Sequence, residues 1–261
     1  MSATEGLSLP NKVAIITGSG RENGIGAAIA LTLARAGAHV TINYVSESSV
    51  SRAAEVVAKI ESTVGKGRVH AVRADVSTPK GSQKIVDETL EAFGVDHIDI
   101  IGLVAGGTIL TSKPEDIMRS FEVAIVGPVL LLQTAYPYIP RGGRIINIGS
   151  VASRMGFVQM PIYAAAKAAM DQLTFTLARE IGRDGKHITI NTVAPGPVLT
   201  DSLPPVPEVE QAKDYLVSLT RAEERVGTVE DIADAVLLLT SEKSRWITGQ
   251  FISVSGGING G

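Results

Sequence analysis

The chain of 261 residues contains no cysteine. This absence excludes disulfide bonds, thiolate nucleophiles and cysteine-based metal sites, and it suits a protein of the reducing cytoplasm. Histidine is scarce, and His39, His70, His97 and His187 lack the mutual spacing of metal ligands. We therefore expect no metal site and a cytoplasmic location.

An excess of positive charge is also absent, because 24 Lys and Arg residues face 27 Asp and Glu residues. Such a balance offers no overall attraction for nucleic acid or acidic lipid. Met1 to Ser8 lack the basic start and apolar core of a secretion signal. The longest apolar run, Val123 to Tyr136, is too short to cross a bilayer and is interrupted by Gln133. These absences favour a small-molecule partner.

What the chain does contain is a 44% hydrophobic composition, enough for one large α/β domain or two small ones. Apolar runs rich in Val and Ile alternate with helical patterns, which is typical of a parallel sheet with helices on both faces. The predicted strands are Val13 to Thr17, Val40 to Tyr44, Arg68 to Arg73, Ile98 to Val104, Arg144 to Gly149, Thr189 to Val193 and Phe251 to Val254. The predicted helices include Gly26 to Arg35, Ser49 to Ser62, Gly81 to Phe93, Ile162 to Ile181 and Val229 to Thr240.

A proline-dense segment follows the sixth predicted strand, at Pro195-Gly196-Pro197 and Leu203 to Pro207. Prolines at this density form neither a regular helix nor an inner strand. The segment is either an ordinary surface loop or a loop over a pocket, because open α/β sheets bind ligands at the carboxyl ends of their strands. We expect a substrate loop or lid at about 197–225.

Two motifs near strand ends are suited to a dinucleotide. The glycine-rich turn from Thr17 to Gly26 connects a strand to a helix, so backbone amides at the helix start can face a pyrophosphate. A turn of this kind also occurs without a ligand. Asp75-Val76 close the third predicted strand, where the carboxylate either accepts a hydrogen bond from an adenine amino group or serves as an ordinary turn residue.

Ser150, Tyr163 and Lys167 form the candidate catalytic group. Tyr163 and Lys167 are one helical turn apart and therefore project from the same face of a helix. An adjacent ammonium stabilises the phenolate and lowers the tyrosine pKa, so the phenol becomes usable as an acid and base. Taken alone, this pair also fits a packed ring beside a solvated cation.

Together these motifs resemble the short-chain dehydrogenase/reductase family over nearly the whole chain, including its fungal-type naphthol reductases and 3-oxoacyl-acyl-carrier-protein reductase-like ketoreductases. Asn191 to Thr200 add to the resemblance. It implies a single Rossmann-like, doubly wound domain over residues 1–261, with a seven-stranded, mostly parallel sheet. It also implies a homotetramer or homodimer.

The resemblance assigns roles to individual residues. Tyr163 gives a proton to the substrate carbonyl, Ser150 bonds the same oxygen, and Lys167 bonds the nicotinamide ribose and lowers the tyrosine pKa. The loop after the sixth strand holds the carboxamide and phosphates. The expected cofactor contacts are Gly18, Ser19, Arg21, Gly24, Ile25, Asn43, Tyr44, Ser46, Asp75, Val76, Ala105, Gly106, Tyr163, Lys167, Pro195, Gly196, Val198 and Thr200.

The expected cofactor is NADP(H). The second strand ends Asn43-Tyr44-Val45-Ser46, without the acidic residue that accepts bonds from a free ribose hydroxyl and repels a 2'-phosphate. Arg21 in the glycine turn also favours the phosphate. Glu47 lies close by and leaves NAD(H) as an alternative.

Three features depart from the family pattern. The glycine turn has five residues between Gly18 and Gly24, where the family usually has three. Leu103-Val104 replace a pair of asparagines, and Ala124 replaces a helix asparagine thought to position water near the lysine. Proton resupply to Tyr163 must therefore follow another route or be slow.

The leading hypothesis is an NADP(H)-dependent reductase of a ketone, or a related carbonyl or imine, on a moderately large apolar substrate of secondary metabolism. Met155, Phe157, Val158 and Met160 support an apolar substrate, although they also fit ordinary packing. One alternative is a non-redox isomerase, cyclase or lyase that keeps the dinucleotide as a structural or template cofactor. Another is a regulatory module that senses the dinucleotide.

Overall fold

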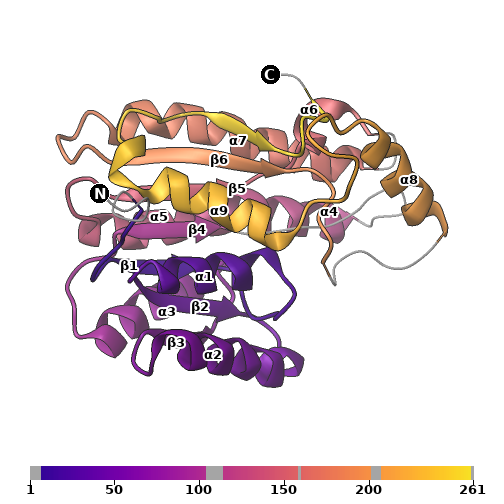
Figure 1. Ribbon diagram of the computed structural model, residues 1–261. Helices are drawn as coiled ribbons and strands as arrows, with labels where there is room; N and C mark the ends of the chain where they lie inside the picture. The colour runs from indigo at the N-terminus through magenta and orange to yellow at the C-terminus, as the bar shows by residue number, and fades with distance from the viewer. Residues whose placement is uncertain (1–6, 104–113, 158–159, 201–206, 260–261) are drawn as a thin grey trace.

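The computed structural model describes residues 7–103, 114–157, 160–200 and 207–259. Within them, seven strands form one parallel sheet in the order β3-β2-β1-β4-β5-β6-β7 (Figure 1). The predicted Rossmann-like α/β fold is confirmed, and every predicted strand is present. The strands are β1 (Val13–Ile16), β2 (His39–Tyr44), β3 (Val69–Arg73), β4 (Ile100–Leu103), β5 (Arg144–Ile148), β6 (Thr189–Pro195) and β7 (Phe251–Val254).

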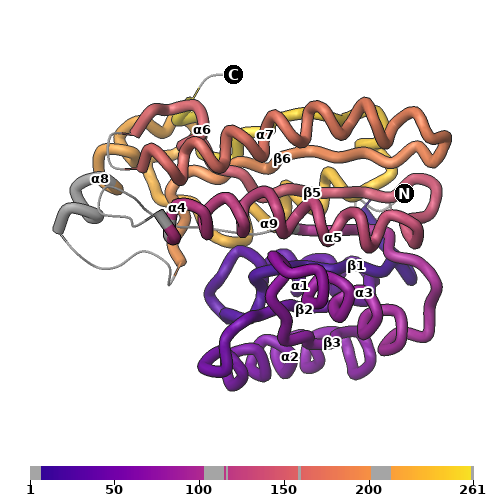
Figure 2. Tube along the Cα trace, turned by 180° about the vertical axis from the view of Figure 1, so that it is seen from behind, coloured from indigo at the N-terminus to yellow at the C-terminus, as the bar shows by residue number. Residues whose placement is uncertain are grey.

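Helices cover both faces of the sheet, as Figures 1 and 2 show from opposite sides. One face carries α1 (Ile25–Arg35), α2 (Val50–Val64) and α9 (Val229–Thr240). The other carries α3 (Pro79–Phe93), α5 (Gly127–Ala135) and α7 (Pro161–Ile181). The shorter elements are η1 (Glu47–Ser49), α4 (Pro114–Phe121), the π-helical turn η2 (Glu122–Val126), η3 (Tyr136–Tyr138), α6 (Ala152–Met155), α8 (Pro207–Ser218) and η4 (Glu242–Ser244).

The two faces bury separate apolar layers. Ile16 on β1 packs with residues of α1 and α9, including Leu33 and Val236. Its neighbour Ile15 packs on the opposite side with Leu131 of α5. Successive strand residues point to opposite faces, so a strand covered on both sides must be apolar at every position. This explains the continuous apolar runs in the sequence.

The proline-dense segment differs in part from the expected loop, because it includes the helix α8. The helix begins at Pro207, the last proline of that cluster. Proline is tolerated in the first helical turn, where its missing N–H has no helical partner in any case. Leu203 to Val206 lie outside the described residues, and the lid function remains a prediction.

The apolar run around α5 belongs to a longer helical stretch than predicted. The helical stretch Ile117–Tyr138 spans 22 residues and, by length and composition alone, is long and apolar enough to cross a membrane. The helical path continues from α4 through η2 into α5. Within α5, Leu131, Leu132 and Ala135 are buried in the apolar layer that also contains residues of the sheet and of α3.

Candidate active site

The structure brings the three predicted catalytic residues to the carboxyl edge of the sheet. Ser150 follows β5, and Tyr163 and Lys167 lie one turn apart on α7. The Lys167 side chain is buried, and its Nζ donates a hydrogen bond of 2.7 Å to the carbonyl of Ile148 at the end of β5. Nζ lies 5.7 Å from the centroid of the Tyr163 ring. The ammonium, phenol and hydroxyl therefore share one site.

The pKa values at this site differ from the expectation. Burial raises the pKa of the Tyr163 phenol above its usual value, and a hydrogen bond with Ser150 opposes that shift. Burial also lowers the pKa of Lys167 to about 8, against an opposing effect of the Asp171 carboxylate. The expectation of a lowered Tyr163 pKa is therefore wrong, because desolvation dominates at both groups.

A buried network of side chains fixes α7 against the sheet. The Asn147 amide of β5 donates a hydrogen bond of 2.7 Å to Thr174 Oγ1, and Thr192 Oγ1 of β6 donates one of 2.9 Å to the same oxygen. All three residues are buried. Thr174 thus joins α7 to two adjacent strands, and the orientation of the catalytic face is held by neutral hydrogen bonds.

Asp171 is a further charged residue of this face that the sequence reasoning missed. It accepts a hydrogen bond of 2.6 Å from Ser153 Oγ, which also lies 2.9 Å from the Ser150 carbonyl. Burial raises the Asp171 pKa, while the Ser153 hydrogen bond lowers it. The spacing of Tyr163, Lys167 and Asp171, each four residues apart, was the available signal.

The glycine-rich turn fits a pyrophosphate. Gly24 is the N-cap of α1 and supplies no side-chain hydrogen bond, so amides of the first helical turn can bind an anion. Gly18 adopts a left-handed φ of 61°. A Cβ at Gly26 would lie 2.8 Å from the Gly18 carbonyl oxygen and 2.9 Å from Ser19 Cα. Only glycine at position 26 allows α1, which begins at Ile25, to approach the turn this closely.

The side chains of Ser19 and Asn43 form structural hydrogen bonds. Ser19 is fully buried, and its Oγ donates to Ile16 O at 2.5 Å and accepts from Asn43 N at 2.9 Å. The Asn43 amide donates to the carbonyls of Val72 and Ala74, at 3.1 and 3.0 Å. These side chains join the turn to β2 and β2 to β3, and the cofactor contacts of Ser19 and Asn43 stay predictions.

The surface beside the end of β2 carries several charged groups. Arg21 and Ser46 are exposed there. Glu47 forms an ion pair with Arg73, so its negative charge has a cationic partner on β3. The Tyr44 side chain packs on Gly20, where a Cβ would lie only 2.6 Å from that of the tyrosine.

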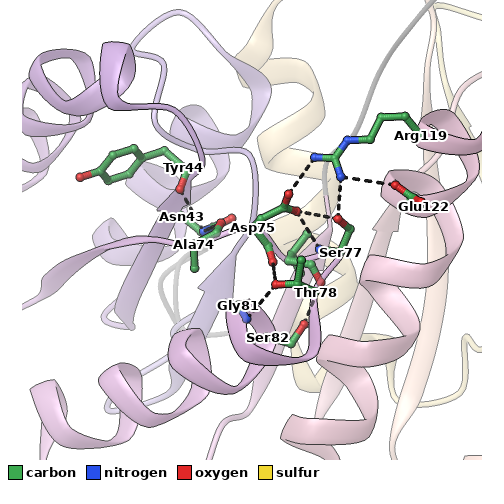
Figure 3. A network of polar contacts seen from close by, with 11 residues as sticks. Asn43, Tyr44, Ala74, Asp75, Ser77, Thr78, Gly81, Ser82, Arg119 and Glu122 are labelled. Atoms are coloured by element: carbon green, nitrogen blue, oxygen red, sulfur yellow. Dashed lines mark hydrogen bonds and ion pairs between the residues drawn. The ribbon is translucent and has the colours of Figure 1, made fainter. Parts of the chain in front are cut away.

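Asp75 and Val76 follow β3, as predicted. Val76 packs against the apolar layer near α5, and a Cβ at Gly127 would lie 3.1 Å from its side chain. The Asp75 carboxylate is held by Ser77 and by Arg119 of α4 (Figure 3). Arg119 is absent from the sequence prediction.

The segment after β6 is fixed by backbone hydrogen bonds. Gly196 N donates to Val254 O at 3.2 Å, and Val198 is buried in a bridge with Gly227. Beside it lies a cavity of about 360 Å³ whose lining includes Pro197, Arg225, Gly227, Ser253 and Gly256. Pro195 ends β6 and Thr200 is half-buried, whereas Ala105 and Gly106 lie outside the described residues.

The departure at Ala124 is visible in the packing. Ala124 is 4% exposed, lies in the π-helical turn η2 and packs with Ala166 and Met170. An apolar side chain thus occupies the place of the family asparagine. Of the other departures, Val104 lies outside the described residues. Among the residues that are described, no group of three or more His, Asp or Glu side chains is arranged to hold a metal ion.

Comparisons with known proteins agree with this geometry. The family model described as Enoyl-(Acyl carrier protein) reductase matches residues 18–259. The chain is 36% identical to versicolorin reductase stcU of Emericella nidulans, covering 98% of this chain and 99% of the relative. It is also 36% identical to a probable tetrahydroxynaphthalene reductase of Zymoseptoria tritici, covering 95% and 94%.

Among solved structures, the angucycline C-6 ketoreductase LanV with bound NADP superposes with a TM-score of 0.86 at 34% identity, covering 96% of each chain. The family model and the relatives extend over nearly all of the sequence. The chain therefore belongs to the short-chain dehydrogenase/reductase family, as its motifs predicted.

Proposed function

We propose that the protein is an NADP(H)-dependent reductase that transfers hydride to a ketone, or a related carbonyl or imine, of a moderately large apolar substrate. The observation that carries the proposal is the shared position of Ser150, Tyr163 and Lys167 at the carboxyl edge of the sheet. When bound, a nicotinamide dinucleotide supplies the hydride. Its pyrophosphate fits the uncapped start of α1.

The chain's own residues manage the proton and the substrate oxygen. Tyr163 Oη donates its proton to the carbonyl oxygen as charge develops there, and Ser150 Oγ donates a hydrogen bond to the same atom. The raised pKa of Tyr163 keeps the phenol protonated at neutral pH, which is the form that a reduction needs. Lys167, anchored on Ile148 O, holds positive charge beside the resulting phenolate and bonds the nicotinamide ribose.

The preference for a 2'-phosphate is supported by the charges at the end of β2. Arg21 is exposed in the glycine turn. Glu22 of the same turn is paired with Arg52, and Glu47, which follows β2, is paired with Arg73. A paired carboxylate repels a phosphate less than a free one. The similar ketoreductase LanV has NADP bound, which supports the proposed preference for a 2'-phosphate.

We infer the substrate class from the activities that the relatives' names state. A versicolorin reductase and a probable tetrahydroxynaphthalene reductase are among them, so we infer a polycyclic phenolic ketone of secondary metabolism. Met155, Phe157 and Met160 lie between Ser150 and the start of α7 and supply apolar side chains near the site. We also propose a homodimer or homotetramer, with the segment at 197–225 as a substrate lid.

The test is a comparison of NADPH and NADH oxidation with polycyclic phenolic ketones, β-keto thioesters and cyclic imines. We expect NADPH-dependent reduction to be fastest with a polycyclic ketone. A clear preference for NADH contradicts the cofactor assignment. A protein that binds the dinucleotide but is inert toward the whole panel favours the regulatory module.

A second candidate is a non-redox isomerase or cyclase that retains the dinucleotide. The apolar surroundings of Ala124 favour it, because no polar side chain at that position resupplies protons to Lys167 and Tyr163. Absorbance of reduced nicotinamide, followed while product forms, separates the two functions. Product without cofactor consumption defeats the reductase.

A further inference from the structure

We propose that Arg119 is a positioning residue for adenine recognition. In this proposal the guanidinium fixes the Asp75 carboxylate so that it accepts a hydrogen bond from the adenine amino group, and it thereby selects adenine over a base with an oxygen at the same position. The proposal rests on dinucleotide binding as described above. It assigns to α4 a part in recognising the cofactor end farthest from the chemistry.

The Asp75 carboxylate is held from two sides (Figure 3). One oxygen, Oδ1, accepts hydrogen bonds from the Ser77 amide at 3.0 Å and the Ser77 hydroxyl at 2.7 Å. The other, Oδ2, accepts from Arg119 Nη2 at 2.9 Å. Arg119 Nη1 donates to Ser77 Oγ at 2.7 Å and so closes a ring of three residues. This ring fixes the rotation of the carboxylate.

Within the part of the chain that the structure describes, one acceptor position of the carboxylate has no hydrogen-bond donor. Each carboxylate oxygen accepts two hydrogen bonds, and Oδ1 has both of its described partners in Ser77. Oδ2 has one described partner, Arg119, and the Asp75 side chain is 31% exposed. The geometry therefore leaves Oδ2 able to accept one further N–H.

The charge state makes this position selective. Burial raises the pKa of Asp75, but the hydrogen bonds from Ser77 and Arg119 outweigh it and leave the pKa below its usual value. An ionised carboxylate only accepts hydrogen bonds. It binds the amino group of adenine and repels the 6-oxygen of hypoxanthine. Arg119 also lies 3.5 Å from Glu122, which is a further charged group facing the guanidinium.

Arg119 joins parts of the chain that are distant in sequence. It projects from α4, whereas Asp75 and Ser77 precede α3. Because the Arg119 side chain is 46% exposed, its ion pair with Asp75 contributes little to stability, and its effect is on orientation. The fork of donors on arginine contacts both Ser77 and Asp75, whereas the single ammonium of lysine would not hold both in this geometry.

The experiment measures dissociation constants of NADPH and its hypoxanthine analogue by fluorescence titration, without substrate. The two ligands differ only at the 6-position and at N1 of the purine, so the ratio of their dissociation constants cancels effects on phosphate binding. We expect the wild-type protein to bind NADPH about tenfold or more tightly than the analogue. This is the affinity that one hydrogen bond to a charged group contributes. In Arg119→Gln the ratio should fall to about twofold, mainly by weaker NADPH binding.

Matched variants separate positioning from general damage. Ser77→Ala removes the hydroxyl from the ring and should also reduce the preference for NADPH over the hypoxanthine analogue. The preference of Arg119→Lys should lie between those of Arg119→Gln and the wild-type protein. Glu122→Gln removes the partner of Arg119 outside the ring. Arg141→Gln removes an arginine that precedes β5 and donates a hydrogen bond to the Gly185 carbonyl, with no described contact to Asp75, Ser77 or Arg119. Both should keep the wild-type ratio.

An unchanged ratio in folded Arg119→Gln and Ser77→Ala overturns the proposal. A larger ratio in Arg119→Gln also overturns it, because it would show that Arg119 competes with adenine for Asp75. Equal affinity of the wild-type protein for NADPH and the hypoxanthine analogue also overturns the proposal. Failure of the wild-type protein to bind NADPH at all is a different result, since it removes the proposed function itself.

Discussion

Burial is the strongest influence on the pKa values of Tyr163 and Lys167 on α7. It raises the pKa of Tyr163 and lowers that of Lys167, so it favours the neutral form of each. A protonated phenol is the acid that carbonyl reduction requires. The reverse reaction requires a phenolate, so oxidation of an alcohol should need a higher pH than reduction.

Replacement of Tyr163 by phenylalanine tests the acid. The ring and its packing remain, but the substrate oxygen loses its proton donor. We expect Tyr163→Phe to reduce kcat by about 10²–10⁴-fold, the usual contribution of a general acid. The dissociation constant for NADPH, measured by fluorescence, should change by less than about threefold. Unchanged kcat would remove Tyr163 from the mechanism.

The pKa of Lys167 predicts a pH-dependent stability. The folded protein releases this proton near pH 8, whereas the unfolded lysine holds it to about 10.5. Between these values the unfolded state binds more protons, so the stability of the wild-type protein rises with pH. Relative to Lys167→Met, the wild-type free energy of unfolding should gain roughly 1–3 kcal/mol between about pH 7 and about pH 10. Denaturant titrations in which the difference in unfolding free energy between the wild-type protein and Lys167→Met does not change with pH would contradict the lowered pKa of Lys167.

The junction between β1 and α1 is the element on which dinucleotide binding depends most. Its shape comes from close backbone packing at Gly26 and from the buried hydroxyl of Ser19. The path of the turn, uncertain from the sequence because of its two additional residues, leaves Arg21 exposed and the start of α1 without a side-chain cap. The longer turn therefore preserves the anion-binding end of the helix.

Substitution of Gly26 by alanine should disturb this junction. The new Cβ would press on the backbone of Gly18 and Ser19, which cannot move without displacing the turn. We expect a loss of about 1–3 kcal/mol in stability and roughly tenfold weaker NADPH binding. Gly227→Ala is a suitable control for stability, because its Cβ would meet neighbours at 3.4 Å or more. Equal unfolding midpoints for the two variants would argue against the close packing.

At the scale of the whole molecule, large apolar side chains remain exposed on the protomer. Phe175 on α7 is 64% exposed, Leu238 on α9 is 56% exposed, and Trp246 is 95% exposed. We expect light scattering to give the mass of a dimer or tetramer. Trp246 is the only tryptophan, so its fluorescence also reports whether that surface is covered. A monomer at micromolar concentration would contradict the predicted assembly.

The sequence was most informative where one strong local signal was sufficient. Helix α9 has the predicted bounds, Val229–Thr240, and a capping box of Thr228 and Asp231 stabilises its start. The predicted strands match within a few residues, since burial on both faces requires continuous apolar runs. Conversely, α8 was missed because a proline at the first helical position does not prevent a helix.

Contacts between distant residues were beyond sequence reasoning. Asn43 bonds the carbonyls of Val72 and Ala74, and Arg119 reaches Asp75 over 44 positions. Neither partner follows from spacing along one element. The direction of the Tyr163 pKa was also missed, because helical spacing places Lys167 nearby but does not give the burial of the phenol.

Transfer of deuterium from NADPH labelled at C4 of the nicotinamide is the most direct measurement of the proposed chemistry. The label should be placed on each face in turn, with a polycyclic phenolic ketone as substrate. One of the two labelled forms should deliver deuterium to the carbinol carbon as NADPH is consumed, and Tyr163→Phe should prevent that transfer. Product that forms without deuterium from either face, or with NADPH unconsumed, would show that this site does not catalyse hydride transfer.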